Sequence, residues 1–220
     1  MTQHTLPEST PGPRVFPGFA LLHPMVVGEV EGLSDAQLDF SSDKWAWANW
    51  SIRTQVRHIA NFLPGWLIRR WGPQLFPQGY GELGDMAEYA KSPHGWWLDE
   101  EKFPDMPSVL KKVKDGLDLA HYILARETLG SMRQKEEPRP DTPPHWSQFM
   151  KAHPTGVRWH PTEANFTYIT LEATFRHLYY EVITHMYNIQ RLKRAQGLEA
   201  AIDLPFEGYW ALPDWDRSEA

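Results

Sequence analysis

Two residues in the last third of the chain, Glu181 and His185, have the types and the spacing to bind one metal ion. They lie in residues 176–190, where apolar side chains recur with a helical period. Residues four apart on a helix lie over the same patch of surface, so the carboxylate and the imidazole can reach one ligand. A carboxylate beside an apolar helix face is costly without a partner. A divalent cation is the partner that we predict, and a hydrogen-bonded Glu–His pair at the edge of a helix seam is the alternative.

His58 can supply a second imidazole from another expected helix. That helix is predicted to begin after Ser51, a good N-cap residue, and to reach about residue 71, with a kink or an early stop at Pro64. A single histidine beside an apolar seam is commonly a packed, hydrogen-bonded residue. Two imidazoles and one carboxylate from two helices, however, form a recurring type of metal site in helical bundles. Three protein ligands also leave a position open, as at catalytic ions.

Residues 50–60, Trp-Ser-Ile-x-x-x-Val-x-His-Ile-Ala, resemble the second-helix motif of the DinB/YfiT-like superfamily of metal-binding four-helix bundles. In that family a histidine follows the capping serine by this spacing, and the last helix adds two ligands four residues apart. The common pair there is His-x-x-x-His. Glu181 and His185 depart from it but are similar to the branch that includes mycothiol-dependent maleylpyruvate isomerase. The resemblance covers all four expected helices loosely and the two motif helices well, and residues 72–106 and 130–161 have no counterpart in it.

The resemblance implies that His58, Glu181 and His185 bind a divalent metal, with zinc or nickel the main candidates. Family members of known activity often use the metal to bind a low-molecular-weight thiol and deliver it to an electrophile. The expected function is therefore that of a thiol-dependent S-transferase or isomerase. A hydrolase that uses a metal-bound water and a non-enzymatic, metal-stabilised binding module are the alternatives. No catalytic acid or base can be assigned from the sequence.

The expected fold is all-α, a single four-helix bundle over residues 1–220 with up-down-down-up topology, the topology being implied by the resemblance. The other helices are predicted at about 18–32, 108–129 with Ser108 as the cap, and from 162 or 168 to 196, with Gly197 at the C′ position. Residues 72–106 and 130–161 are expected to be long irregular connections, without strand pairs, that could cover a site at one end. Residues 1–15 are expected to form a loose arm, and residues 198–220 a tail.

Several other polar residues are candidates for supporting roles. His177, one turn before Glu181, could orient that carboxylate, although a position at the rim is the simpler interpretation. Among the spare imidazoles we expect His160 to approach the ion most readily; the others are His121, His145 and His153. Arg69 and Arg70 could face an anionic substrate, although a solvated helix end explains them equally simply.

Composition narrows the class of protein. With 220 residues and 41% hydrophobic residues, the chain can bury the core of one large domain. The net charge of -6 argues against a nucleic-acid-binding scaffold. No apolar run could cross a bilayer, and the N-terminus does not resemble a signal peptide, so we expect a cytoplasmic protein that acts on a small molecule. The absence of cysteine excludes disulfides and protein thiolate ligands. A homodimer through an exposed helix face is a further expectation.

Overall fold

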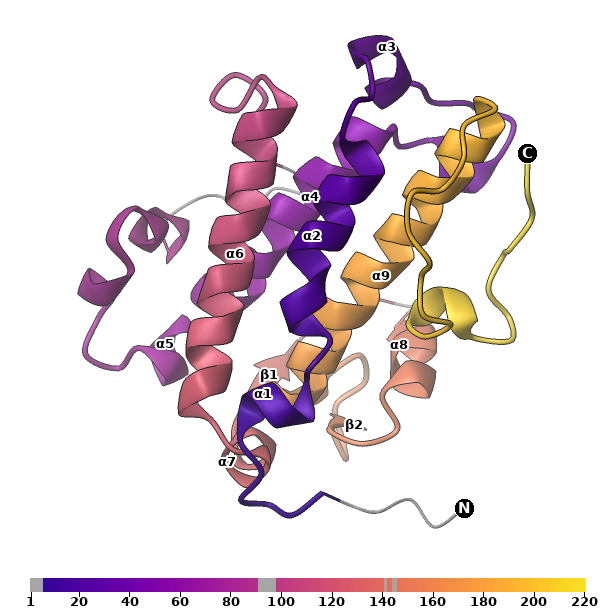
Figure 1. Ribbon diagram of the computed structural model, residues 1–220. Helices are drawn as coiled ribbons and strands as arrows, with labels where there is room; N and C mark the ends of the chain where they lie inside the picture. The colour runs from indigo at the N-terminus through magenta and orange to yellow at the C-terminus, as the bar shows by residue number, and fades with distance from the viewer. Residues whose placement is uncertain (1–5, 91–97, 141, 144–145) are drawn as a thin grey trace.

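The computed structural model describes residues 6–90, 98–140, 142–143 and 146–220. It is mostly helical, as predicted, and its longest helices pack side by side as a bundle (Figure 1). These helices are α2 (Phe19–Val30), α4 (Ile52–Pro64), α6 (Met106–Arg126) and α9 (Leu171–Ala195). The shorter helical elements are α1 (Gly12–Val15), α3 (Asp35–Leu38), η1 (Ala46–Ala48), η2 (Gly65–Arg70), α5 (Gly72–Leu75), η3 (Gly81–Ala90), α7 (Leu129–Gln134), α8 (Trp146–Ala152) and η4 (Tyr209–Ala211). Within the described part of the chain, no helix has both the length and the apolar character needed to cross a membrane.

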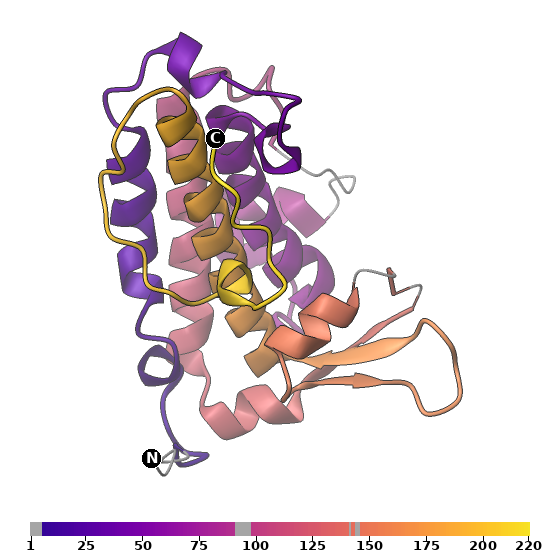
Figure 2. The same cartoon turned by 90° about the vertical axis from the view of Figure 1, so that its right-hand side faces the viewer.

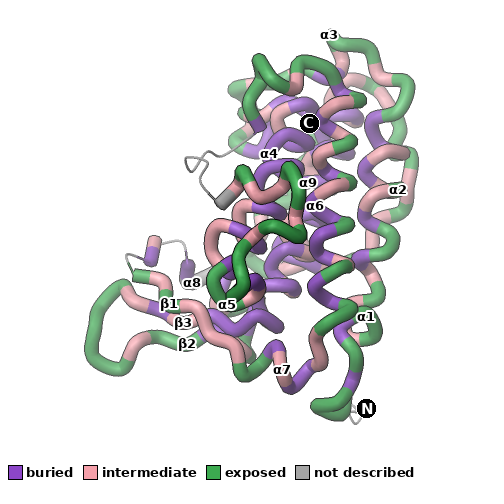
Figure 3. The backbone as a smooth tube through the Cα atoms, turned by 90° about the vertical axis from the view of Figure 1, so that its left-hand side faces the viewer, coloured by how far each residue is buried: buried purple, intermediate pink, exposed green. Residues whose placement is uncertain are grey.

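The core lies between the long helices. Helix α4 packs against both α6 and α9, and α2 packs against the same two helices from the other side. The inward faces of these helices are buried (Figure 3), and their apolar side chains form one continuous cluster. Trp71, just beyond η2, is fully buried, and its indole N–H donates to Thr174 Oγ1 at 3.0 Å. This bond joins the end of the α4–η2 segment to the first turn of α9.

Helix α4 begins where the sequence predicts, because Ser51 caps it by accepting a hydrogen bond from the Thr54 amide at 3.2 Å. The regular α-helix ends at Pro64 and continues as the π-helix η2. Proline has no N–H to donate to the preceding turn, which favours a local change of helical geometry. The Trp71 amide then donates to the Trp66 carbonyl, five residues earlier, at 3.1 Å. The predicted kink or stop at Pro64 is therefore confirmed.

Two predicted helix boundaries were wrong. Helix α6 is capped by Asp105, which accepts from the Ser108 amide at 2.8 Å, so Ser108 lies inside the helix and is not its cap. Helix α9 begins at Leu171 with Thr170 as its cap, later than either predicted start, because the residues before it belong to a strand. At the other end, Gly197 has a φ of +73° at the C′ position, as predicted.

The connection between α6 and α9 contains a small antiparallel sheet, which corrects the prediction of an all-α fold without strand pairs. Its order is β1-β3-β2, and the strands are β1 (Glu136–Arg139), β2 (Val157–Trp159) and β3 (Thr167–Thr170). Figure 2 shows the β2–β3 hairpin projecting beside α8 at one end of the bundle. The strands are too short to show an alternating pattern, and Pro138 within β1 reads as a strand breaker. Pro138 is tolerated because β1 is an edge strand.

The C-terminal segment, residues 198–220, runs back along α9 (Figure 2). A buried carboxylate fixes its beginning: Glu29 Oε1 accepts from the amides of Ala201 and Ile202, both at 3.1 Å, and from Gln190 Nε2 at 2.7 Å. Glu29 Oε2 forms an ion pair with Lys193 Nζ at 2.6 Å, and neither side chain is appreciably exposed. The buried carboxylate of Glu29 thus connects α2 with α9 and with the C-terminal segment.

Replacing Lys193 by methionine keeps the aliphatic stem but leaves the Glu29 carboxylate buried without its cation. Removing one partner of a buried ion pair costs about 3–5 kcal/mol. We expect Lys193→Met to lower the free energy of unfolding in urea by about this amount. Lys111→Met is the control: Lys111 is mostly exposed and pairs with Asp115 along the same helix, so the expected change is about 0.5 kcal/mol or less. Equal losses in both variants would contradict this account.

Candidate metal centre

The structure brings together the three residues singled out as metal ligands. One ring nitrogen of His58, one of His185 and one carboxylate oxygen of Glu181 all lie within 4.8 Å of one another. The two histidines are buried and Glu181 is partly exposed. Within the described residues, this is the one His/Cys/Asp/Glu group in which three ligand atoms converge in this way. The cluster can therefore hold one ion close to the surface of the bundle.

The positions of the three ligands follow from two helices in contact. Glu181 and His185 lie one turn apart on α9, and His58 lies two turns after the cap of α4, which packs on α9. The rings of His58 and His185 have their centroids 4.7 Å apart. One ligand thus comes from α4 and two come from α9, so the site exists only while these helices are packed.

The spacing of the ligand atoms suits a transition-metal ion. His185 Nε2 and Glu181 Oε2 are 3.3 Å apart. Two atoms that each lie about 2.1 Å from one ion at a tetrahedral angle are separated by about 3.4 Å. Two imidazoles and a carboxylate also match the donors that zinc and nickel accept. The three residues therefore fit a divalent cation by donor type, and the Glu181–His185 pair also fits it by spacing.

Gln55, which was not among the residues predicted from the sequence, fixes the orientation of the His185 ring. Its side-chain oxygen accepts a hydrogen bond from His185 Nδ1, and Gln55 is almost fully buried. With the proton held on Nδ1, the Nε2 atom is the one that faces Glu181. Hydrogen bonds of this kind commonly set the tautomer of metal-binding histidines. Gln55 lies one turn before His58, so its helical spacing was a signal that could have identified it.

Glu181 is a carboxylate at neutral pH, as a metal ligand must be. Burial by itself raises its pKa, but the hydrogen bond with His185 and the neighbouring His177, His185 and His58 lower it, to about 2. The carboxylate is the acidic member of a group that otherwise consists of imidazoles. A cation between them would balance its negative charge.

Aromatic rings cover the two histidine ligands. The Trp50 ring lies parallel to the His185 ring with the centroids 6.0 Å apart, and it contacts the His58 ring at 5.1 Å. Phe62, one turn after His58, contacts that ring at 5.3 Å. These contacts restrict the side-chain rotations of the two imidazoles.

His177 is not at the rim, the position expected from the sequence. It is buried, and its Nδ1 atom lies 2.6 Å from the Tyr209 hydroxyl and 3.7 Å from Glu181 Oε1. The same hydroxyl lies 2.7 Å from His153 Nε2. His177, Tyr209 and His153 therefore form a hydrogen-bonded chain that starts beside Glu181. Tyr209 could not be linked to this site from sequence, because it lies in the irregular C-terminal segment, 32 residues after His177.

His177 and His153, the two histidines hydrogen-bonded to Tyr209, are both neutral at neutral pH. Burial lowers the pKa of His177 to about 4, although Glu181 opposes the shift. Burial, with smaller effects of His177 and Arg176, lowers the pKa of His153 to about 2. The Tyr209 hydroxyl has one proton, so it donates to one of these imidazoles and accepts from the other. The arrangement holds His177 in a fixed orientation beside the metal cluster.

The remaining histidines lie elsewhere, or outside the described residues. The prediction that His160 approaches the ion was wrong: its Nδ1 accepts from the amides of Thr162 and Glu163, in the loop between β2 and β3. His121 lies on α6, with its ring edge-on to Phe19. His145 lies outside the described residues.

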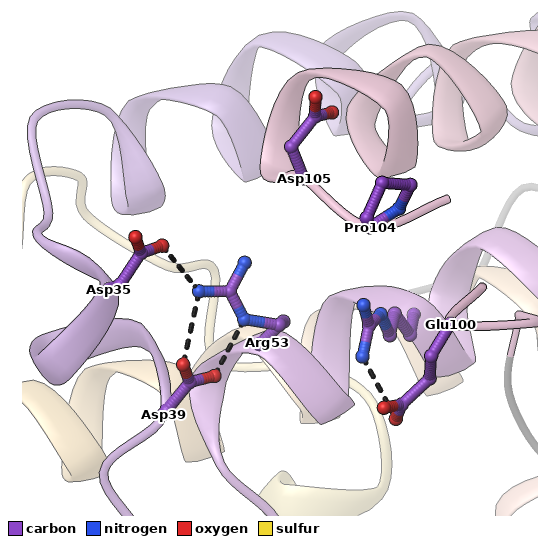
Figure 4. A pocket seen from close by; sticks show the side chains of 7 residues that line it. Asp35, Asp39, Arg53, Glu100, Pro104 and Asp105 are labelled. Carbon is purple, nitrogen blue, oxygen red and sulfur yellow. Dashed lines mark hydrogen bonds and ion pairs between the residues drawn. The ribbon is translucent and has the colours of Figure 1, made fainter. Parts of the chain in front are cut away.

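A separate polar cavity of about 610 Å³ lies where α4 and α6 begin (Figure 4). In it Arg53 donates to Asp39 at 2.6 Å and to Asp35 at 2.7 Å. Arg57 pairs with Glu100 at 2.8 Å. Carboxylates of the chain thus neutralise both arginines, and we assign these contacts to the stability of the helix junction.

Comparison with known proteins finds no matching family model, no similar curated protein and no similar solved structure. The function is therefore inferred from the geometry of the site and from the sequence motifs.

Replacing Gln55 by leucine should weaken metal binding without removing a ligand. The variant leaves the Nδ1–H of His185 without its acceptor, so the ring loses the interaction that fixes its orientation. Loss of such a partner typically weakens metal affinity by about 10- to 100-fold. Competition with a chromophoric chelator measures the affinity. Gln74→Leu is the control, since Gln74 bonds to Glu136 and Glu137 away from the site. Equal affinities in wild type and Gln55→Leu would contradict this role.

The stability of the metal-free protein should fall as the pH drops below about 6.5. His153 has a lowered pKa of about 2 in the folded state, so below its ordinary pKa of 6.5 only the unfolded chain takes up this proton. Each such group lowers the free energy of unfolding by about 1.4 kcal/mol per pH unit in this range. Urea titrations at pH 7, 6 and 5 with a chelator present measure the slope. We expect His153→Phe to reduce this slope by about 1.4 kcal/mol per pH unit. An unchanged slope would refute the effect of burial on the pKa of His153.

Proposed function

We propose that this protein is a divalent-metal-binding, DinB-like helical-bundle protein in which His58, Glu181 and His185 hold the ion. The observation that carries the proposal is the convergence of their three ligand atoms within 4.8 Å from two packed helices. Two independent features support it: Gln55 presets the ring of His185, and the motif around Ser51 and His58 resembles the second helix of that superfamily.

We further propose that the bundle is a single domain with the up-down-down-up topology of that superfamily. Contacts at the helix ends support this topology. At one end, Arg53 at the start of α4 pairs with Asp35 after α2, and Gln196 at the end of α9 donates to Gln37. At the other end, the amide of Gly12, ahead of α2, donates to the carbonyl of Glu127, just after α6. Helices α2 and α9 then run in one direction, and α4 and α6 in the other.

The proposed activity is transfer or isomerisation that depends on a low-molecular-weight thiol. A bound zinc or nickel ion would act as a Lewis acid that lowers the pKa of a coordinated thiol or water. The chain has no cysteine, so the thiol would have to come from a small molecule. Three protein ligands leave coordination positions for such a molecule. The expected partner is a small-molecule substrate; a homodimer and a cytoplasmic location stay predictions from the sequence.

The metal site is tested by removing its imidazoles. We expect His58→Ala and His185→Ala each to lose most of the bound metal, because two remaining ligands bind a divalent ion far more weakly than three. Elemental analysis of protein purified without a metal-binding tag measures the metal content per chain.

His160→Ala is the matched control, since His160 lies in the β2–β3 loop, away from the cluster, and its removal should leave the metal content unchanged. Stoichiometric metal in both ligand variants would refute the site. If chelation changes neither the melting temperature nor the binding of small thiols in the wild-type protein, the protein is a non-enzymatic binding module and the proposed enzyme function is refuted. Thiol-independent hydrolysis that needs the metal would favour the hydrolase instead.

A further inference from the structure

Two arginines lie together next to the candidate metal centre. Arg70 is the last residue of η2, and Arg139 is the last residue of β1. Both guanidinium groups lie over the indole of Trp66, at 4.4 Å and 5.6 Å from the ring centroid. Arg139 also lies over the ring of Trp146, at 3.9 Å. A helix end and a strand from distant parts of the sequence thus place two cations around one tryptophan.

These arginines are separated from the metal cluster by two aromatic rings. The Trp66 ring meets the His177 ring edge-on, with centroids 4.7 Å apart. His177 in turn lies 3.7 Å from Glu181. The charges of Arg139 and Arg70 also contribute to the lowered pKa of His177, after the larger effects of burial and Glu181. The cationic pair is therefore a neighbour of the proposed centre.

Neither arginine has a carboxylate partner in the described part of the chain, where no carboxylate oxygen lies within 4.0 Å of either guanidinium. Glu137 is near Arg70, but its carboxylate accepts from Gln74 Nε2 at 3.0 Å. Burial, and then the charge of Arg70, lowers the pKa of Arg139 to about 10. A partly buried charge without a directly paired counter-charge is unfavourable, and the nearby charge of Glu137 offsets the burial of Arg70 only in part. Arg53, also buried, is by contrast paired with two aspartates.

Within the described residues neither guanidinium group donates a hydrogen bond to the protein, so their N–H groups can bind a ligand. An arginine stacked on an indole uses its flat face, while its N–H groups point outward in the plane of the group. Two such groups around one tryptophan can present several donors to one oxygen anion. Arginine binds carboxylates through paired, charge-assisted hydrogen bonds of this kind.

We propose that Arg70 and Arg139 form an anion subsite, which binds the carboxylate group of a small organic ligand beside the metal centre. The assignment of this ligand as the substrate or the thiol of that centre rests on the proposed function. The subsite itself depends only on the two arginines and their tryptophans. It narrows the ligand class to small organic acids that are long enough to contact both the arginines and the ion.

Calorimetric titration of zinc-loaded protein tests the subsite with two probes. Succinate has carboxylates only, and 3-mercaptopropionate has one carboxylate and one thiol. We expect Arg70→Gln and Arg139→Gln each to weaken the binding of both probes by about 10- to 100-fold, the usual effect of losing a charge-assisted hydrogen bond. Arg70→Lys and Arg139→Lys keep the charge but lose the paired geometry, so their losses should be smaller.

Arg158→Gln is the matched control. Arg158 also lies over an aromatic ring, that of Tyr168, at 4.0 Å, but it pairs with Glu136 at 2.7 Å. This variant should bind both probes as the wild type does. The zinc content of every variant is measured separately and should be unchanged, which shows that the fold and the ligand cluster are intact.

The outcomes separate the subsite from the metal centre. If the wild type binds zinc but neither probe, or if the Arg→Gln variants bind the probes as the wild type does, the subsite is refuted and the metal centre stands. If the wild type binds no zinc but binds succinate in an arginine-dependent manner, the proposed function fails and the subsite stands. Loss of 3-mercaptopropionate binding on chelation, with succinate binding retained, would assign the carboxylate to a thiol ligand and support the subsite.

Discussion

The packing of α4 against α9 is the contact on which the rest of the structure depends. It places His58 of one helix against Glu181 and His185 of the other, and it aligns Gln55 with the ring of His185. The hydrogen bond between Trp71 and Thr174 fixes the same pair of helices further along. Because close-packed helices have few alternative registers, a small shift would separate the ligand atoms. The contact that stabilises the bundle is therefore also the one that builds the site.

The C-terminal segment supplies residues that surround the metal ligands. It is held at its beginning by the buried carboxylate of Glu29 and further along by the Tyr209 amide, which donates to Thr184 Oγ1 at 3.1 Å. Tyr209 can therefore reach between His177 and His153. Burial keeps both imidazoles neutral, so the positive charges near the centre come from arginines. The same segment thus contributes to stability and to the polar surroundings of Glu181.

Charge pairing distinguishes structural from candidate binding arginines in this protein. Arg53 and Arg57 have carboxylate partners within the chain and join α3, α4 and the segment before α6. Arg70 and Arg139 lie over tryptophan rings instead. The difference arises from the connections, because the π-helix after Pro64 positions Arg70, and the small sheet positions Arg139. The connections between the long helices therefore supply the two arginines of the proposed subsite.

The sequence by itself determined what depends on neighbouring residues. Helical spacing placed Glu181 and His185 on one face, and the hydroxyl of Ser51 and the ring of Pro64 set where α4 begins and where it changes geometry. Only the tertiary structure decided that His58 meets that pair, that Tyr209 bonds His177, and that the residues before α9 form a sheet. Backbone geometry fixes distances within a helix, whereas distances between elements depend on the packing of many side chains, which no single motif encodes.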